Sequence, residues 1–388
     1  MVFPMISKRI QEITPFLVMD VMERAKELEK KGVDIIHLEV GEPDFDTPAC
    51  IKNAAIRALE KGYTHYTHSL GLLELREAIC EYYKERYRVD LHPDQVLVTS
   101  GTSPALLMIF SVILEPGDKV IISDPHYPCY PNFIRFVNGE VVTVPVFEEE
   151  GFQYCVEEIR KRIDTRTKGI VINSPSNPTG NLLSPERMAA IAELSPLVIS
   201  DEIYHGLVYE GEEHSILEYT DRAFVLNGFS KLYAMTGWRL GYLIAPKEFI
   251  RSLQKIQQNF FISANAIVQW AGIAALREAG EDVRRMKEIY DQRRRFMITR
   301  LKKIGFGISV EPTGAFYVLA NARHIFHDSY ALAFDILEKA QVGVTPGIDF
   351  GKNAEGYLRF SYANSLEHIV EGMDRIEQYL KSRNILAS

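Results

Sequence analysis

Cysteine is scarce in this sequence, and its spacing offers neither a disulfide framework nor a zinc site. The 388-residue chain has only Cys50, Cys80, Cys129 and Cys155, without any CxxC pair. Disulfide scaffolds and cysteine-rich zinc sites need paired, regularly spaced cysteines. We therefore expect a protein of a reducing compartment, the cytoplasm, with no metal.

Long apolar runs and an excess of positive charge are missing too. No stretch approaches the ~20 apolar residues that a membrane-spanning helix needs. The first segment, MVFPMISKRI, has an apolar patch too short for a secretion signal. The formal net charge of −8 disfavours nucleic acid and membrane surfaces as partners. We expect neither a membrane nor a nucleic-acid partner.

The centre of the chain alternates short apolar runs with helical patterns, as in segments 103–114 and 184–194. Such runs are typical of strands covered on both faces of a parallel sheet. Ser184 followed by Pro185 is a favourable helix start. The alternation predicts a doubly wound α/β domain. The runs are QVLVTS (95–100), KVIISD (119–124), GIVINS (169–174), LVISDE (197–202) and FVLNGF (224–229).

The two ends of the chain predict a smaller α+β domain, formed by 1–45 and 286–388, beside a large domain of 46–285. Helical patterns cover 11–31, 281–303 and a segment from about Leu366, and strand-like pieces cover 314–320 and 356–363. Within 281–303 lies the run Arg293-Arg294-Arg295. We expect a solvated helix face there, because acidic residues flank the run and the net charge is negative.

A phosphate-sized anion site is predicted after the first apolar run, with contributions from the segment after the fifth. Ligands bind at the carboxyl ends of strands in open α/β sheets. After the first strand, Gly101, Thr102 and Ser103 open a helix whose N–H groups can cradle an anion, although a plain capped helix start has the same pattern. Ser230 and Arg239 can complete the site. Without GxGxxG or a P-loop lysine, a single phosphate fits better than a nucleotide.

Other strand ends carry groups suited to a flat ring. Asp201 follows a buried strand and can pair with a protonated ring nitrogen, or act as a helix cap or ion-pair partner. Asn177 and Tyr204 can reach a ring hydroxyl, and Tyr127 can stack on the ring. A nitrogen-containing, hydroxylated ring with one phosphate, held by Lys231, describes pyridoxal 5′-phosphate (PLP).

These motifs make the whole chain similar to the class I/II aminotransferases of PLP fold type I, the aspartate aminotransferase superfamily. The resemblance implies a mostly parallel seven-stranded sheet in the large domain, PLP as cofactor, L-amino acid and 2-oxoacid substrates, and a homodimer. The motifs are GEPDFDTP (41–48), HYTHSLGLLELREAI (65–79), SGTSPAL (100–106), DPHYPCY (124–130), SNPTG (176–180), SDEIYHGLVYEG (200–211), SKLYAMTGWRLGY (230–242) and LRFSYA (358–363).

The resemblance also implies a role for each matched residue around the cofactor ring. Lys231 matches the Schiff-base lysine, which later moves a proton, and Asp201 matches the partner of the pyridine nitrogen. Asn177 and Tyr204 match the donors to the ring oxygen, and Tyr127 takes the stacking position.

Phosphate and substrate contacts follow from the same resemblance. Tyr66 matches a tyrosine that reaches the phosphate of the neighbouring subunit. Arg359, helped by the backbone at Gly41, matches the clamp on the substrate α-carboxylate. The phosphate cup matches Thr102, Ser103, Ser230 and Arg239.

The amino acid that serves as donor is less closely specified. Aspartate-specific relatives often have small hydroxyl residues near the N-terminus and a lysine in the phosphate loop, where this chain has TPFLVMD (14–20) and Ser103. Phe16 either forms an apolar wall or simply packs on the adjoining helix. The wall favours a neutral donor, with 2-oxoglutarate as an acceptor, in ping-pong half-reactions. The alternatives are an aspartate aminotransferase and a PLP-dependent C–S β-lyase.

Overall fold

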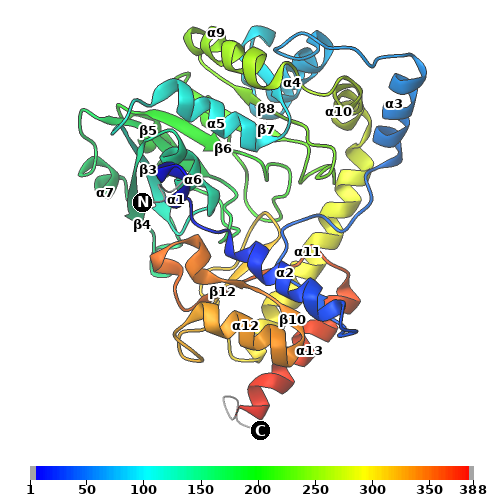
Figure 1. The fold of residues 1–388 in the computed structure, drawn as a ribbon, viewed down its shortest axis with the longest axis vertical. Helices are drawn as coiled ribbons and strands as arrows, with labels where there is room; N and C mark the ends of the chain where they lie inside the picture. The colour runs from blue at the N-terminus through cyan, green and yellow to red at the C-terminus, as the bar shows by residue number, and fades with distance from the viewer. Residues whose placement is uncertain (1–5, 384–388) are drawn as a thin grey trace.

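The computed structural model describes residues 6–383, and a seven-stranded sheet lies at its centre (Figure 1). The strand order is β2-β8-β7-β6-β5-β3-β4, and only β8 runs antiparallel to its neighbours. The predicted fold class is confirmed, and all five apolar runs are strands. The strands are β2 Val96–Thr99, β3 Lys119–Asp124, β4 Glu140–Pro145, β5 Thr167–Asn173, β6 Leu197–Asp201, β7 Ala223–Gly228 and β8 Gly241–Ile244.

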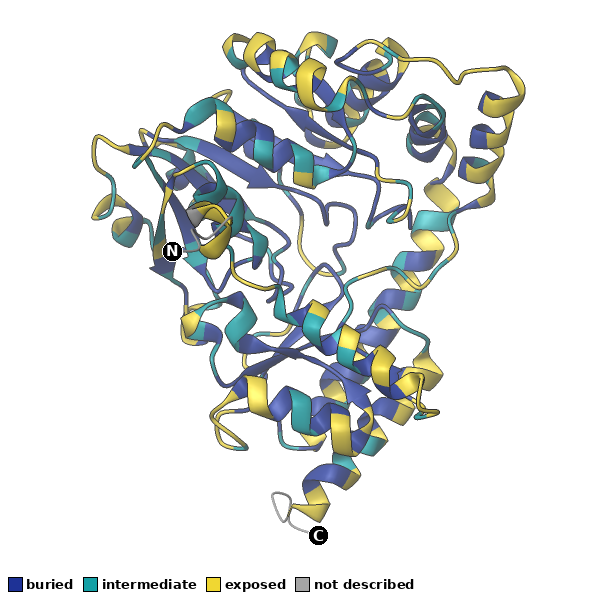
Figure 2. Cartoon of the chain, in the orientation of Figure 1, coloured by how far each residue is buried: buried dark blue, intermediate teal, exposed yellow. Residues whose placement is uncertain are grey.

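Helices cover both faces of this sheet, so its strands are largely buried, except for the edge strand β4 (Figure 2). Every residue of β2, β7 and β8 is buried, which explains why these strands lack an alternating polar pattern. The Ser184 hydroxyl accepts the N–H of Arg187 at 3.3 Å, so the predicted N-cap is confirmed. The helices are α3 Ala49–Glu60, α4 Leu73–Tyr87, α5 Thr102–Ile113, α6 Cys129–Phe136, α7 Val156–Arg160, α8 Pro185–Ala192, α9 Lys247–Ile256 and α10 Ala266–Glu278.

Segments 17–37 and 317–382 meet in a second layer below the large sheet, whereas α1 (Lys8–Gln11) lies beside α6 of the large sheet, so the first part of the expected segment 1–45 does not belong to this layer (Figure 1). Three antiparallel strands have the order β11-β12-β9, and β1 pairs with β10 in parallel. The elements are β1 Ile36–His37, β9 Tyr317–Asn321, β10 Val342–Gly343, β11 Thr345–Pro346, β12 Tyr357–Ser361, α2 Leu17–Glu29, α12 Ser329–Ala340 and α13 Leu366–Ser382.

The long helix α11 (Gly280–Lys303) connects the two layers. The expected domain boundary between 285 and 286 falls inside this unbroken helix, and the division into 46–285 and the two flanking segments stays a prediction. Residues 1–5 and 384–388 of the expected small domain lie outside the described residues. Between residues 6 and 383, no helix has the length and apolarity needed to cross a bilayer.

The helix expected over 11–31 is wrong in its first part. The chain forms α1 (Lys8–Gln11), then a non-helical stretch, and then α2 from Leu17. Pro15 disfavours helical geometry in the residue before it. The Asp349 carboxylate accepts the N–H groups of Leu17 and Val18 at 3.0 and 3.3 Å. This carboxylate, distant in sequence, therefore fixes where α2 begins.

The solvated face expected for the arginine run on α11 is also wrong, except at Arg295. Arg293 and Arg294 are buried, with 7% and 1% of their surface exposed. Arg293 forms two hydrogen bonds to Asp44, at 2.7 and 2.9 Å, and Arg294 donates to the Pro312 carbonyl at 2.7 Å. These partners lie far away in the sequence, so the local charge pattern does not reveal them.

Candidate active site

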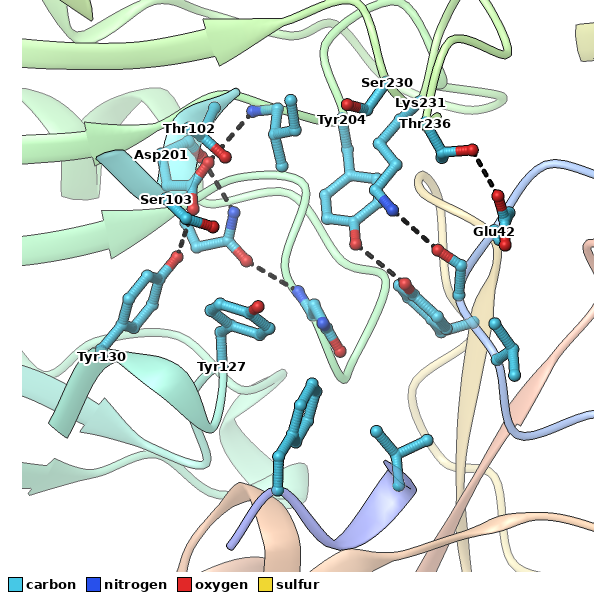
Figure 3. A pocket seen from close by; sticks show the side chains of 18 of the residues that line it. Glu42, Thr102, Ser103, Tyr127, Tyr130, Asp201, Tyr204, Ser230, Lys231 and Thr236 are labelled. Carbon is cyan, nitrogen blue, oxygen red and sulfur yellow. Dashed lines mark hydrogen bonds between the residues drawn. The ribbon is translucent and has the colours of Figure 1, made fainter. Parts of the chain in front are cut away.

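A cavity of about 320 Å³ opens at the carboxyl ends of the large sheet, facing the second layer (Figure 3). Parallel strands deliver their following loops to one edge, which explains why residues distant in sequence meet there. Of the residues predicted for the site, the following line the cavity: Phe16, Gly41, Thr102, Ser103, Tyr127, Asn177, Asp201, Tyr204, Ser230, Lys231, Arg239 and Arg359.

Lys231 extends into this cavity from the loop after β7. Its amino group donates a hydrogen bond of 2.7 Å to the Gly41 carbonyl. Burial lowers the pKa of Lys231, Glu42 acts against that change, and the positive charges of Arg359 and Arg239 add to it, so that the resulting pKa is about 8. The amine is therefore far more often unprotonated near neutral pH than an exposed lysine.

Asp201, the last residue of β6, lies at the opposite side of the cavity. Its carboxylate accepts the hydroxyl of Tyr130 at 2.6 Å and the N–H of Ile203 at 3.2 Å. Burial raises the pKa of Asp201, whereas these two donors lower it. Tyr130 also lines the cavity, but its sequence pattern gave it no role. Its place in the DPHYPCY motif, three residues after Tyr127, was the available signal.

The anion end of the cavity lies at the start of α5. Gly101 caps this helix with φ +91°, and a Cβ added there would lie 2.6 Å from the Arg239 guanidinium. Arg239 itself has φ +54°, an uncommon backbone geometry for a side-chain-bearing residue. Thr102, Ser103 and Ser230 line the same end. Free first-turn N–H groups, hydroxyls and a guanidinium together suit a phosphate.

Arg359, on β12, is buried at the other end of the cavity. It donates to the Asn177 side-chain oxygen at 2.9 Å and to the Glu39 carbonyl at 2.6 Å. Its guanidinium carbon lies 4.3 Å from the centre of the Tyr317 ring. Sequence reasoning missed Glu39 and Tyr317, because nothing in the local pattern around either residue marks a contact with Arg359.

Tyr204 also faces the cavity, and its hydroxyl lies 2.8 Å from the hydroxyl of Tyr317. Beside them, Asn177 is held in place by its N–H, which donates to the Asn173 side chain at 2.8 Å. The two predicted ring-oxygen donors, Tyr204 and Asn177, thus line the same cavity.

An apolar wall closes the cavity on the side of α2. Phe16 contacts Tyr127 edge to face, with ring centres 6.0 Å apart. Further lining residues on this side are Val18, Met19 and Met22. Val18 belongs to the TPFLVMD segment from which the wall was predicted. The two methionines were missed from the sequence, and they extend the wall along one face of α2.

Two predicted site residues, Tyr66 and Gly101, do not line this cavity; Gly101 caps α5 beside it, whereas Tyr66 lies apart from it. The side chain of Tyr66 lies in the segment between α3 and α4 and has 85% of its surface exposed. Its expected role depends on a second subunit.

Comparison with known proteins agrees with this geometry. Residues 33–376 match the family Aminotransferase class I and II. The chain is 44% identical over 380 residues to the (5-formylfuran-3-yl)methyl phosphate transaminase of Methanocaldococcus jannaschii, covering 97% of this chain and 100% of the relative. It is 40% identical over 385 residues to the aspartate aminotransferase of Pyrococcus horikoshii, covering 97% of each.

A solved structure from Methanococcus jannaschii, described as similar in its active site to kynurenine aminotransferases, matches with a TM-score of 0.91. Its sequence identity is 43%, and the match covers 97% of this chain and 100% of that one. The chain therefore belongs to the class I and II aminotransferases, and it is a transaminase. The predicted family and enzyme class are confirmed. Members of this family generally use PLP and act on amino acids and 2-oxoacids.

Proposed function

We propose that this aminotransferase holds PLP on Lys231 and moves the amino group of a neutral, apolar L-amino acid to a 2-oxoacid such as 2-oxoglutarate, in two half-reactions at one site. The observation that carries the proposal is the position of the Lys231 amino group. It shares one cavity with a carboxylate, Asp201, a phosphate-sized cup at Arg239 and a second guanidinium, Arg359.

The residues present fit this cofactor at each of its polar groups. Arg239 and the start of α5 fit the phosphate, and a side chain at Gly101 would obstruct this end. Asp201 fits the ring nitrogen, and Tyr204 and Asn177 fit the ring oxygen. When bound, PLP supplies an electron sink for the negative charge left on the substrate Cα.

The chain's own residues then orient the substrate and move its proton. Asp201 holds a proton on the ring nitrogen, because a buried carboxylate favours a nearby positive charge. Arg359 binds the substrate carboxylate and turns the Cα–H bond toward Lys231. Once the substrate amine has displaced it from the cofactor, the freed Lys231 amine, whose pKa is near 8, would take up that proton from the substrate Cα and deliver it to the cofactor carbon that had been bonded to Lys231, as a general base and then acid.

The donor side chain is proposed to lie against the apolar wall at Phe16. Of the described residues that line the cavity, only Lys231, Arg239 and Arg359 carry positive charge, and each already has a partner in the scheme above. The similarity of the Methanococcus structure to kynurenine aminotransferases supports an apolar or aromatic donor. Aspartate is the second candidate, supported by the name of the Pyrococcus relative.

A homodimer is part of the proposal. Tyr66 is highly exposed, as are the nearby apolar side chains of Ile56, Leu59 and Tyr63, and such surface suits an interface between subunits. If Tyr66 reaches the partner's phosphate, Tyr66→Phe should weaken PLP binding while leaving the dimer intact in sedimentation velocity. A monomeric wild-type protein would contradict this part of the proposal.

The enzyme is further proposed to act in a reducing compartment such as the cytoplasm. All four cysteines are free and each is half-buried. Free, partly accessible thiols persist where glutathione and thioredoxin keep them reduced.

Absorption spectroscopy of the PLP-loaded protein tests the central proposal. Single amino acids are added to the protein, and the visible band of the bound cofactor is followed. Conversion to the pyridoxamine form by neutral donors supports the proposal, and conversion by aspartate alone favours the second candidate. Release of ammonia and pyruvate would instead indicate a C–S β-lyase. Lys231→Ala should fold normally and lose turnover entirely, so retained transamination would contradict the role of Lys231.

A further inference from the structure

We infer that Tyr317, on β9, is a positioning residue that connects the two ends of the active site. Its hydroxyl fixes the orientation of the Tyr204 hydroxyl, and its ring supports the guanidinium of Arg359. This inference rests on the proposed function, in which Tyr204 faces the cofactor and Arg359 binds the substrate carboxylate.

Among residues 6–383, the hydroxyl group of Tyr317 has a single side-chain hydrogen-bond partner, the Tyr204 hydroxyl at 2.8 Å. Both tyrosines are buried, with 2% and 4% of their surface exposed, yet both line the cavity. A tyrosine has one proton to donate. If Tyr317 gives its proton to Tyr204, the Tyr204 proton remains available for an acceptor in the cavity. The arrangement thus orients the Tyr204 proton toward a ring oxygen.

The lack of a side chain at Gly41 leaves room for the Tyr317 hydroxyl. A Cβ added to Gly41 would overlap the Tyr317 hydroxyl. The carbonyl of the same glycine accepts the hydrogen bond from Lys231 at 2.7 Å. The Tyr317 hydroxyl, the Lys231 amine and Tyr204 therefore converge around Gly41, which explains the need for glycine at this position.

The ring of Tyr317 has a separate contact with Arg359. The guanidinium carbon lies 4.3 Å from the ring centre, within the range of a cation–π interaction. In the antiparallel register, Tyr317 pairs with Ser361 and Leu319 pairs with Arg359. Tyr317 and Arg359 are thus diagonal neighbours on one face of the β9–β12 ladder, close enough for long side chains to touch.

Two substitutions separate the hydroxyl from the ring. Tyr317→Phe removes the hydroxyl and keeps the surface beneath Arg359, whereas Tyr317→Leu removes both. Tyr290→Phe is the matched control, because Tyr290 is equally buried and, within residues 6–383, its hydroxyl has no hydrogen-bond partner. All three are compared with the wild type as PLP-loaded enzymes, after thermal unfolding confirms that they are folded.

The first readout is the pH midpoint of the change in bound-cofactor absorbance. A weaker hydrogen-bond donor at the ring oxygen leaves more negative charge on that oxygen. The Lys231 nitrogen that holds the cofactor lies beside it and therefore keeps its proton to higher pH. Tyr317→Phe should raise the midpoint by about half a unit, the size expected for one weakened hydrogen bond. Tyr204→Phe should raise it more. A midpoint for Tyr317→Phe equal to that of the wild type would overturn the role of the hydroxyl.

The second readout is the binding of 3-phenylpropanoate, a carboxylate that lacks an amino group and cannot react. Its dissociation constant should rise about fivefold in Tyr317→Leu, as expected for loss of a cation–π contact, and stay unchanged in Tyr317→Phe. Equal affinities for the two variants would overturn the role of the ring. A wild-type protein without a cofactor band would contradict the proposed function itself, which separates the two failures.

Discussion

The Tyr130 hydroxyl donates a 2.6 Å hydrogen bond to the Asp201 carboxylate, and both groups are buried at the floor of the active site. Burial raises the pKa of Asp201, and the tyrosine acts against that rise. The role proposed for Asp201, holding a proton on the cofactor nitrogen, requires an ionised carboxylate, and the hydrogen bond from Tyr130 favours that form.

Replacing Tyr130 with Phe should therefore destabilise the protein freed of PLP, and more so at neutral than at acid pH. The folded-state pKa of Asp201 lies above its ordinary value, so stability is greatest when the carboxyl is protonated and falls as the pH rises through that pKa. Tyr130→Phe raises this pKa further. The loss in free energy of unfolding should be about 1.5–3 kcal/mol at pH 7 and smaller near pH 4.

Urea unfolding at the two pH values measures this difference, with Tyr290→Phe as the control for removing a buried hydroxyl. A loss of equal size at both pH values would show that Tyr130 contributes packing alone and does not act on the charge of Asp201.

For Lys231, the stability of the fold changes with pH in the opposite direction. Its folded-state pKa of about 8 lies below the ordinary 10.5, so the protonated amine destabilises the fold, and stability is lost as the pH falls from about 10.5 to about 8. Lys231→Met removes this cost. The variant should lose all transamination, yet its cofactor-free form should be more stable at pH 7, by up to about 3 kcal/mol at 1.36 kcal/mol per pH unit.

The gain should disappear above a pH of about 10.5, where the lysine is neutral in both the folded and the unfolded chain. Thermal unfolding across this range provides the measurement. Lys247→Met, at the exposed start of α9, controls for removal of a lysine charge and should show no such gain. If Lys231→Met is less stable than the wild type at pH 7, the buried protonated amine of Lys231 does not destabilise the fold.

The sheet was largely predictable from the sequence, because buried parallel strands consist of consecutive apolar residues. β8 was not among those runs: Gly241–Ile244 is only four residues long and begins two residues after Arg239, at the end of a glycine-containing loop. Its place between β2 and β7 depends on pairing with strands far away in sequence, and no local pattern contains that information.

Some residues of the active site were likewise predictable from the sequence, and others were not. Lys231 and Asp201 were predictable, because polar side chains directly after buried strands have few structural explanations. Tyr130 and Tyr317 were not assigned, because an aromatic residue in an apolar segment is usually part of the core. Their functional contacts are to residues 71 and 113 positions away, and only the folded chain brings those hydroxyls together.

Shortening the apolar wall should change which donor is preferred. In Phe16→Ala, kcat/KM for phenylalanine and leucine should fall about tenfold, the scale of lost apolar contact in a binding pocket, whereas kcat/KM for alanine should change little. Steady-state kinetics with the three donors tests this, and Phe326→Ala, at an exposed position outside the cavity, is the control. Equal losses for alanine and phenylalanine would mean that Phe16 does not contact the donor side chain.

The two neighbouring arginines on α11 provide a matched test of buried charge. Arg294 has 1% of its side chain exposed and pairs with Asp291 and Glu210, whereas Arg295 has 69% exposed and pairs with Asp291 alone. Arg294→Met also leaves the Pro312 carbonyl without its donor, so it should lower the free energy of unfolding by about 3–5 kcal/mol. Arg295→Met should cost less than about 1 kcal/mol. Urea unfolding of both variants decides the matter, because similar losses would show that the Arg294 network contributes no more than a surface pair.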